Sequence, residues 1–88
     1  MTSIRKEFDN RIEYRNREGD LHREDGPARE YNTGTKAWFI NGKFHRTDGP
    51  AVEYSDGEKW WYLNDKNYLE EDWEQEVAKI KLKRILDL

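Results

Sequence analysis

The sequence predicts a mainly β protein, a curved antiparallel β-meander of hairpin repeats capped by one amphipathic helix at the C-terminus. Residues 22–41 and 45–64 are identical at 12 of 20 positions when they are aligned with an offset of 23 residues. Both segments end in a two-residue turn signal, and beyond Lys66 the apolar pattern changes from every second residue to a helical spacing. A period of this length is typical of repeat proteins, whose units bury their apolar faces by stacking on their neighbours.

We expect the 88 residues to form a single domain. Its parts are a degenerate N-terminal capping repeat over 1–20, two 23-residue repeats over 21–66 and a C-terminal helix over 67–88. Charged residues make up 40% of the chain and hydrophobic residues only 34%, yet four Trp and five Tyr are too many for a disordered segment. The aromatic rings must therefore supply most of the core.

The composition also argues against several classes of protein. The absence of cysteine excludes disulfides, thiolate metal sites and a cysteine nucleophile. The net charge of −3 comes from acidic and basic residues that are interspersed, so no basic stripe favours nucleic acid. No apolar run is long enough for a membrane span or a signal peptide, and we expect a soluble cytoplasmic protein without a membrane partner.

The N-terminal unit is expected to form strands at about Ile4–Phe8, Arg11–Arg15 and Leu21–Arg23. The 23-residue offset places Phe8 in the position of Tyr31 and Arg15 in the position of Trp38. These strands carry more charge than the later ones, as a terminal capping repeat should.

The two full repeats each contain a short and a long turn. Asn41-Gly42 and Asn64-Asp65 are residue pairs that tolerate the positive φ angles of a two-residue type I′ hairpin. These turns predict four cross-strand pairs: Ile40 with Lys43, Phe39 with Phe44, Trp38 with His45, and Trp61 with Tyr68. Residues 32–35 and 55–58 are read as four-residue turns with glycine in the left-handed conformation.

The C-terminal helix is expected to start at a capping box of Asn67 and Glu70 and to end at about Leu86. One apolar stripe, Leu69, Trp73, Val77 and Ile80, can cover the sheet. A second stripe on nearly the opposite side consists of Ala78, Leu82, Ile85 and Leu86. A single helix cannot turn both stripes to one sheet, so we expect the second to form a homodimer or to contact a partner.

At the spacing Phe39, Gly42, His45 the chain resembles the MORN repeat, a 23-residue β-hairpin unit. It is more similar to a MORN-like variant with the segment His-Arg-x-Asp-Gly-Pro-Ala, which occurs here at 22–28 and 45–51. Proteins with this segment look like small uncharacterised proteins of tailed phages and large DNA viruses, and the resemblance implies that this chain is one of that kind. The extra residue in this segment, compared with ordinary MORN repeats, implies a bend that also suits its proline.

The repeated polar residues are interpreted as structural. His22 and His45 recur at the structural period, whereas catalytic centres rarely do, and Asp25 and Asp48 are expected to accept backbone N–H groups before Gly-Pro. Trp38 and Trp61 occupy matching core positions. We expect no catalytic, cofactor or metal site, and hence no enzyme.

Alternation along residues 59–63 prevents Trp60 and Trp61 from lying on the same face, so one of them should be exposed. We expect partner contacts from Trp60, Tyr62, Arg46, Leu82, Ile85 and Leu86. The favoured function is a viral accessory protein that binds and modulates or inhibits a host protein, such as a defence component. The alternative is a protein that binds a nucleotide or nucleic acid through an exposed Trp and Arg.

Overall fold

The computed structural model describes residues 3–87. Residues 1–2 and 88, at the ends of the expected first unit and of the expected helix, lie outside the described residues. The elements are β1 (Ile4–Glu7), β2 (Arg11–Arg15), β3 (Arg29–Tyr31), β4 (Lys36–Ala37), β5 (Phe39–Ile40), β6 (Lys43–Phe44), β7 (Val52–Glu53), β8 (Lys59–Leu63), β9 (Lys66–Tyr68) and α1 (Glu70–Leu86).

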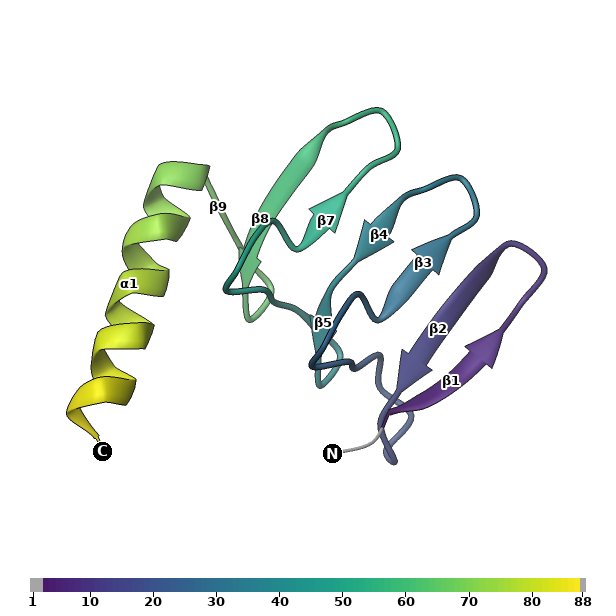
Figure 1. Cartoon of the computed structure of the whole chain (residues 1–88), viewed down its shortest axis with the longest axis horizontal. Helices are drawn as coiled ribbons and strands as arrows, with labels where there is room; N and C mark the ends of the chain where they lie inside the picture. Colours follow the sequence, from purple (N-terminus) through teal and green to yellow (C-terminus); the bar gives the residue numbers. More distant parts are fainter. Residues whose placement is uncertain (1–2, 88) are drawn as a thin grey trace.

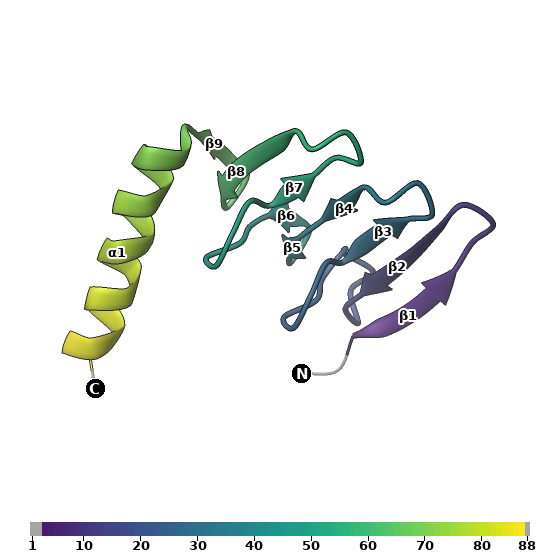
Figure 2. The same cartoon turned by 45° about the horizontal axis from the view of Figure 1, so that its top comes forward.

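Seven strands form one antiparallel sheet in the order β1-β2-β3-β4-β7-β8-β9, and β5 and β6 form a separate small hairpin. Three long hairpins lie side by side, and α1 stands at the β8–β9 end (Figure 1). Their loops follow one edge, while the short turns lie at the opposite edge (Figure 2). The predicted fold class, an antiparallel meander with one C-terminal helix, is confirmed for the described residues.

The predicted turns are confirmed by their backbone angles. Asn41 and Gly42 have φ of 50° and 80°, and Asn64 and Asp65 have 49° and 70°. The predicted register follows from these turns, because Phe39 pairs with Phe44 and Trp61 with Tyr68. Gly34 and Gly57 in the longer turns also have positive φ, which glycine adopts without steric cost.

The N-terminal unit differs from its expected alignment by one residue. Tyr14, and not Arg15, takes the position of Trp38, because the Tyr14 amide donates to the Ala28 carbonyl as the Trp38 amide does to Ala51. The turn after β2 is one residue longer than its counterpart, and the turn before β2 is one residue shorter. A fixed 23-residue offset therefore assigns the wrong residue within β2.

Two other expectations at element ends were wrong. Leu21 forms only an isolated bridge with Arg15 and not a strand. The expected capping box is absent, because Asn67 belongs to β9 and its side-chain amide donates to the Trp61 carbonyl. The helix begins at Glu70 after Leu69, which supplies no side-chain cap. Acidic residues in the first turn take the place of a cap by complementing the helix dipole.

The core has two parts. The first consists of Ala28, Ala37, Phe39 and Val52, and Leu21, Phe44 and Tyr62 pack against it. Its rings form a continuous stack, since Phe39 and Phe44 have centroids 4.3 Å apart and Phe44 and Tyr62 4.9 Å apart. This stack joins the short β5–β6 hairpin to the last repeat.

The second part of the core lies under α1. Trp73 and Val77 are buried against Leu63, with Trp61, Tyr68 and Ile80 around them. The inner stripe is confirmed except for Leu69, which is 69% exposed and lies before the first helical turn. The outer stripe is exposed as predicted, at Ala78, Leu82, Ile85 and Leu86.

Candidate functional site

The repeated segment His-Arg-x-Asp-Gly-Pro-Ala folds into a tight loop around its arginine. The guanidinium of Arg46 lies over the ring of Trp38, with its central carbon 3.7 Å from the ring centroid. Arg46 Nε donates to Asp48 Oδ1 at 2.9 Å, and its Nη1 donates to the Pro50 carbonyl at 3.0 Å and to Glu53 Oε2 at 2.8 Å. Where we expected backbone N–H donors to this aspartate, the structure has a guanidinium donor.

The first copy of the segment repeats these contacts. Arg23 lies 4.0 Å from the centroid of the Tyr14 ring, and it donates to Asp25 at 3.0 Å and to the Pro27 carbonyl at 3.3 Å. The final alanines, Ala28 and Ala51, are completely buried. The segment thus has a structural role, in which each arginine closes its own loop and covers an aromatic ring that precedes it in the chain.

Glycine in this segment makes room for the arginine. A Cβ on Gly49 would lie 2.7 Å from Arg46 Cζ, and one on Gly26 would lie 2.9 Å from Arg23 Cζ. Both distances are closer than carbon atoms approach without displacement. The glycine is needed for the close approach of the guanidinium, since neither residue has a positive φ.

The aromatic position of the last repeat has a different cover. Trp61 lies against Trp73 of α1, with ring centroids 4.6 Å apart. Trp73 Nε1 also donates to the Arg46 carbonyl at 2.9 Å. The tryptophan of α1 thus takes the place that the arginine of a following repeat would occupy.

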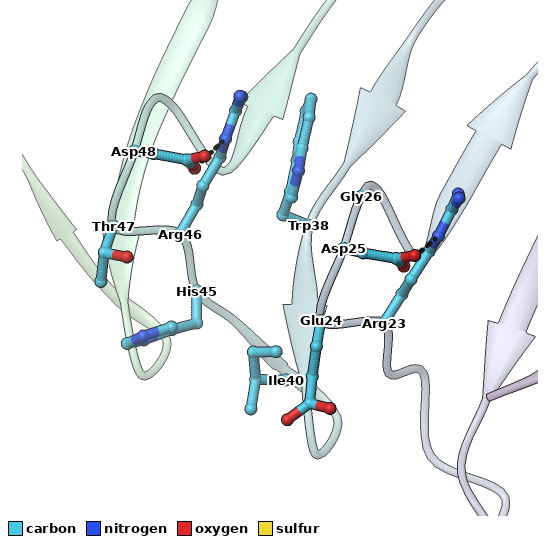
Figure 3. Close-up of a pocket in the computed structure, with 10 residues that line it drawn as sticks. All are labelled: Arg23, Glu24, Asp25, Gly26, Trp38, Ile40, His45, Arg46, Thr47 and Asp48. Carbon is cyan, nitrogen blue, oxygen red and sulfur yellow. Dashed lines mark hydrogen bonds and ion pairs between the residues drawn. The ribbon is translucent and has the colours of Figure 1, made fainter. Parts of the chain in front are cut away.

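A groove of about 470 Å³ lies between the two repeated loops. Figure 3 shows Trp38 at its centre, with the Arg46 loop on one side and the Arg23 loop on the other. Asp25 and Asp48 line it as well, and each is paired with the arginine of its own loop. Trp38 and the two arginine–aspartate pairs of the groove are therefore engaged in contacts within the protein.

The two histidines close the short turns of their own repeats. Nδ1 of His22 accepts the Asn41 amide at 3.0 Å, and Nδ1 of His45 accepts the Asn64 amide at 3.1 Å. A neutral imidazole that accepts a hydrogen bond at Nδ1 carries its proton at Nε2. Its Nε2 atom therefore has no free lone pair and cannot act as a base. Burial and the charge of Arg84 lower the pKa of His45, which favours this neutral form.

The N-terminal unit contains a buried ion cluster that sequence analysis missed. Glu13 is 1% exposed and accepts hydrogen bonds from Arg11 at 2.8 Å, Arg15 at 2.9 Å and Arg29 at 3.1 Å. Burial alone would raise the pKa of this carboxyl, but the bonds from Arg11 and Arg15 and the charge of Arg29 lower it to about 2. The signal in the sequence was the alternation of Arg and Glu along 11–15.

The expected partner-binding residues do not form one site. Trp60 is 39% exposed and pairs with Val52, whereas Trp61 is turned to α1, as alternation predicted. Tyr62 is half-buried against Phe44, and Arg46 is turned to Trp38 and not to Trp60. The remaining three, Leu82, Ile85 and Leu86, lie together on α1.

Metal sites and membrane spans are the other features to consider in residues 3–87. These residues contain no group of three or more His, Cys, Asp or Glu side chains placed to hold a metal ion. None of their helices has the length and apolar character that a bilayer span requires.

No family model matches the chain, and neither a curated protein nor a solved structure matches it.

Proposed function

We propose that this protein is an interaction module that binds another protein through its exposed apolar surfaces and does not catalyse a reaction. The observation that carries the proposal is that the repeated polar residues and the exposed apolar residues have different roles. Every polar residue of the repeated segment that is common to both copies holds the fold together. Large apolar side chains nevertheless remain in contact with solvent at Tyr54, Trp60, Leu82, Ile85 and Leu86.

The exposed side chains are of the kinds that dominate binding energy between proteins. Trp and Tyr are enriched at interface hot spots, and an apolar surface rimmed by charge is typical of a contact with a partner. Leu86 is 74% exposed and Ile85 65%, on a helix whose other side is buried. Burying such side chains against a partner removes apolar area from water, which stabilises the complex.

The resemblance to MORN-like proteins of phages and large DNA viruses supports a more specific form of the proposal. In this form the protein is a viral accessory protein of the host cytoplasm, which binds a host protein and modulates or inhibits it. Components of host defence are natural candidates for that partner. The nucleotide-binding alternative is weaker, because Arg46 already pairs with Asp48 and Glu53 and would have to leave both.

The test is to recover a partner from host lysate with the tagged full-length chain and then to rebuild the complex from two purified proteins. We expect a stoichiometric complex that is lost in a Trp60→Ser/Leu82→Glu variant. The matched control is Glu18→Lys, an exposed change in the turn after β2. Failure to obtain any stoichiometric protein complex, or equal loss in the control, would refute the proposal.

A further inference from the structure

The register of the sheet aligns residues in or next to the ends of six strands in one row. Arg11 pairs with Tyr31 in β2 and β3. Backbone hydrogen bonds extend this line, because Phe8 donates to Arg11, Tyr31 to Thr35, and Tyr54 to Glu58. Cross-strand partners point to the same face of a sheet. One face therefore presents, in spatial order, Phe8, Arg11, Tyr31, Thr35, Tyr54 and Glu58.

The aromatic residues of this row recur on every second strand. Phe8, Tyr31 and Tyr54 occupy the same position in the three units, so the row repeats with the sheet itself. Neighbouring strands lie about 4.8 Å apart, which separates successive aromatic residues by about 9.6 Å. Phe8 is 43% and Tyr54 45% exposed, and Tyr31 is half-buried. We call Phe8, Tyr31 and Tyr54 the aromatic row.

A hollow lies at one end of the aromatic row, and a further aromatic ring lies at the other end. The hollow, of about 410 Å³ at the loop edge of β1–β3, is lined by Phe8, Arg11 and Tyr31 of the row and by Glu7, Ile12 and Glu30 of the opposite face. On the face of the row, the Arg11 guanidinium lies over the Phe8 ring, 4.2 Å from its centroid. At the other end Trp60 of β8 lies next to the row, because it comes two residues after Glu58 and therefore points to the same face of the sheet. Its ring is 39% exposed and its Nε1 donates to Glu58 at 2.9 Å.

The spacing selects one conformation of a bound chain. A polyproline II helix has three residues per turn and rises about 3.1 Å per residue, so every third residue faces the same side at intervals of about 9.3 Å. An extended β-chain repeats on one side at about 6.8 Å, which falls out of step with the rings after one interval. Rows of aromatic side chains are also the surfaces that recognise polyproline II segments, because the rings pack on proline.

We propose that the aromatic row binds a proline-rich segment of a partner protein in the polyproline II conformation, with prolines three residues apart seated at successive rings. This inference rests on the proposed function, and it names the chemistry of the partner. The segment runs across the strands, from β1 towards β8. A polyproline II segment loses little conformational entropy on binding, which suits a short and shallow surface.

Charges at the two ends of the row give the segment an orientation. Lys6, Arg11, Arg15 and Arg29 lie around a single carboxylate, that of Glu13, on the face of the row. The opposite end carries the Glu58 carboxylate. A bound segment should therefore place an acidic residue near Phe8 and a basic residue near Glu58.

The experiment is a calorimetric titration of the full chain with the synthetic peptide Glu-Pro-Ala-Ala-Pro-Ala-Ala-Pro-Lys and with the same residues reordered so that no two prolines are three apart. We expect the first peptide to bind at least tenfold more tightly than the second. Tyr54→Ala and Phe8→Ala should each weaken it tenfold. The control Leu69→Ala, which alters an exposed apolar residue at the start of α1, should leave binding unchanged.

Three results would overturn the inference. The first is equal affinity for the two peptides, and the second is no saturable binding at millimolar peptide. The third is tight binding of an eight-residue oligothymidylate that falls steeply with salt and is lost in Tyr54→Ala, which would assign the row to single-stranded nucleic acid. If the peptides fail while a host protein still forms a complex, the inference falls and the proposed function stands.

Discussion

The two ends of the sheet carry the same hairpin unit but are stabilised by different forces. At the N-terminal end a buried carboxylate, Glu13, is surrounded by three arginines. At the C-terminal end Trp61, Trp73 and Leu63 form an apolar cluster. The comparison teaches that the hairpin geometry is set by turns and register, whereas the interactions that cover it can change from one end to the other.

The largest expected effect of a single change is at the C-terminal end. Trp73→Ala removes the ring that lies on Trp61 and the bond from Nε1 to the Arg46 carbonyl. Truncation of a buried tryptophan costs about 3–5 kcal/mol. Urea unfolding of Trp73→Ala and of the control Trp73→Phe, which keeps a ring but loses the bond, measures the cost. A loss below about 1 kcal/mol in the alanine variant would show that α1 is not part of the cooperative unit.

Glu13→Gln tests the other end and should cost about 3 kcal/mol at pH 7, because it leaves three half-buried guanidinium groups without their counter-charge. The folded pKa of Glu13, about 2, lies below its ordinary value of 4.5. Its contribution is therefore present above pH 4.5 and is lost as the pH falls towards 2. The difference in unfolding free energy between wild type and variant should shrink over that range, and a constant difference would contradict the assignment.

Gly49→Ala probes the arginine loop that both full repeats share. The new Cβ would displace the guanidinium of Arg46 from Trp38, and because that group ends a flexible side chain we expect a cost of about 1 kcal/mol. The cost should largely disappear when the same change is made in an Arg46→Ala background, which a double-mutant cycle measures. An unchanged cost in that background would place the strain in the backbone of the loop.

His22→Ala and His45→Ala compare the two turn-closing bonds directly. Each variant leaves one backbone amide without its acceptor, at a cost of about 1 kcal/mol or more. His22 is buried at 4% exposure and His45 is half-buried, so His22→Ala should cost more. Because the pKa of His45 is lowered from 6.5 in the folded state, stability should also fall as the pH drops below 6.5. This pH dependence should be absent in His45→Ala.

The smallest effect on the stability of the single chain is expected for Leu82→Glu/Leu86→Glu, because both side chains are exposed. Surface changes of this kind stay within about 0.5 kcal/mol. The predicted homodimer would pair this surface with its copy about a two-fold axis. Light scattering at high protein concentration should show a wild-type dimer and a monomeric variant, and a monomeric wild type would refute the dimer.

The turns and their register could be predicted because they depend on local residue chemistry. Asn41-Gly42 fixes which residue faces which, and the pairing of Phe39 with Phe44 follows from it. The exposure of Trp60 followed from alternation along one strand. These inferences needed no knowledge of how distant segments meet.

The features that could not be predicted depend on turn lengths and on contacts between segments that are far apart in the sequence. The exchange of Arg15 for Tyr14 in the repeat position came from two compensating changes of turn length, which a fixed offset cannot register. The capping box at Asn67 was wrong because pairing of β9 with β8 outweighed the local preference for a cap. Glu13 and the aromatic row were visible only in part, because their neighbours come from separate strands.

The bond from each histidine to the turn at the end of its own unit has a consequence for how such a chain can lengthen. His22 accepts the Asn41 amide and His45 accepts the Asn64 amide, so each of the two full repeats contains both the donor and the acceptor of the bond that closes its turn. Duplication of a whole unit in the gene would therefore copy donor and acceptor together and leave no bond unmatched. Since α1 contacts the last unit, through the β8–β9 pair and the Arg46 carbonyl, longer chains could arise by insertion of units ahead of that one, without redesign of either terminus.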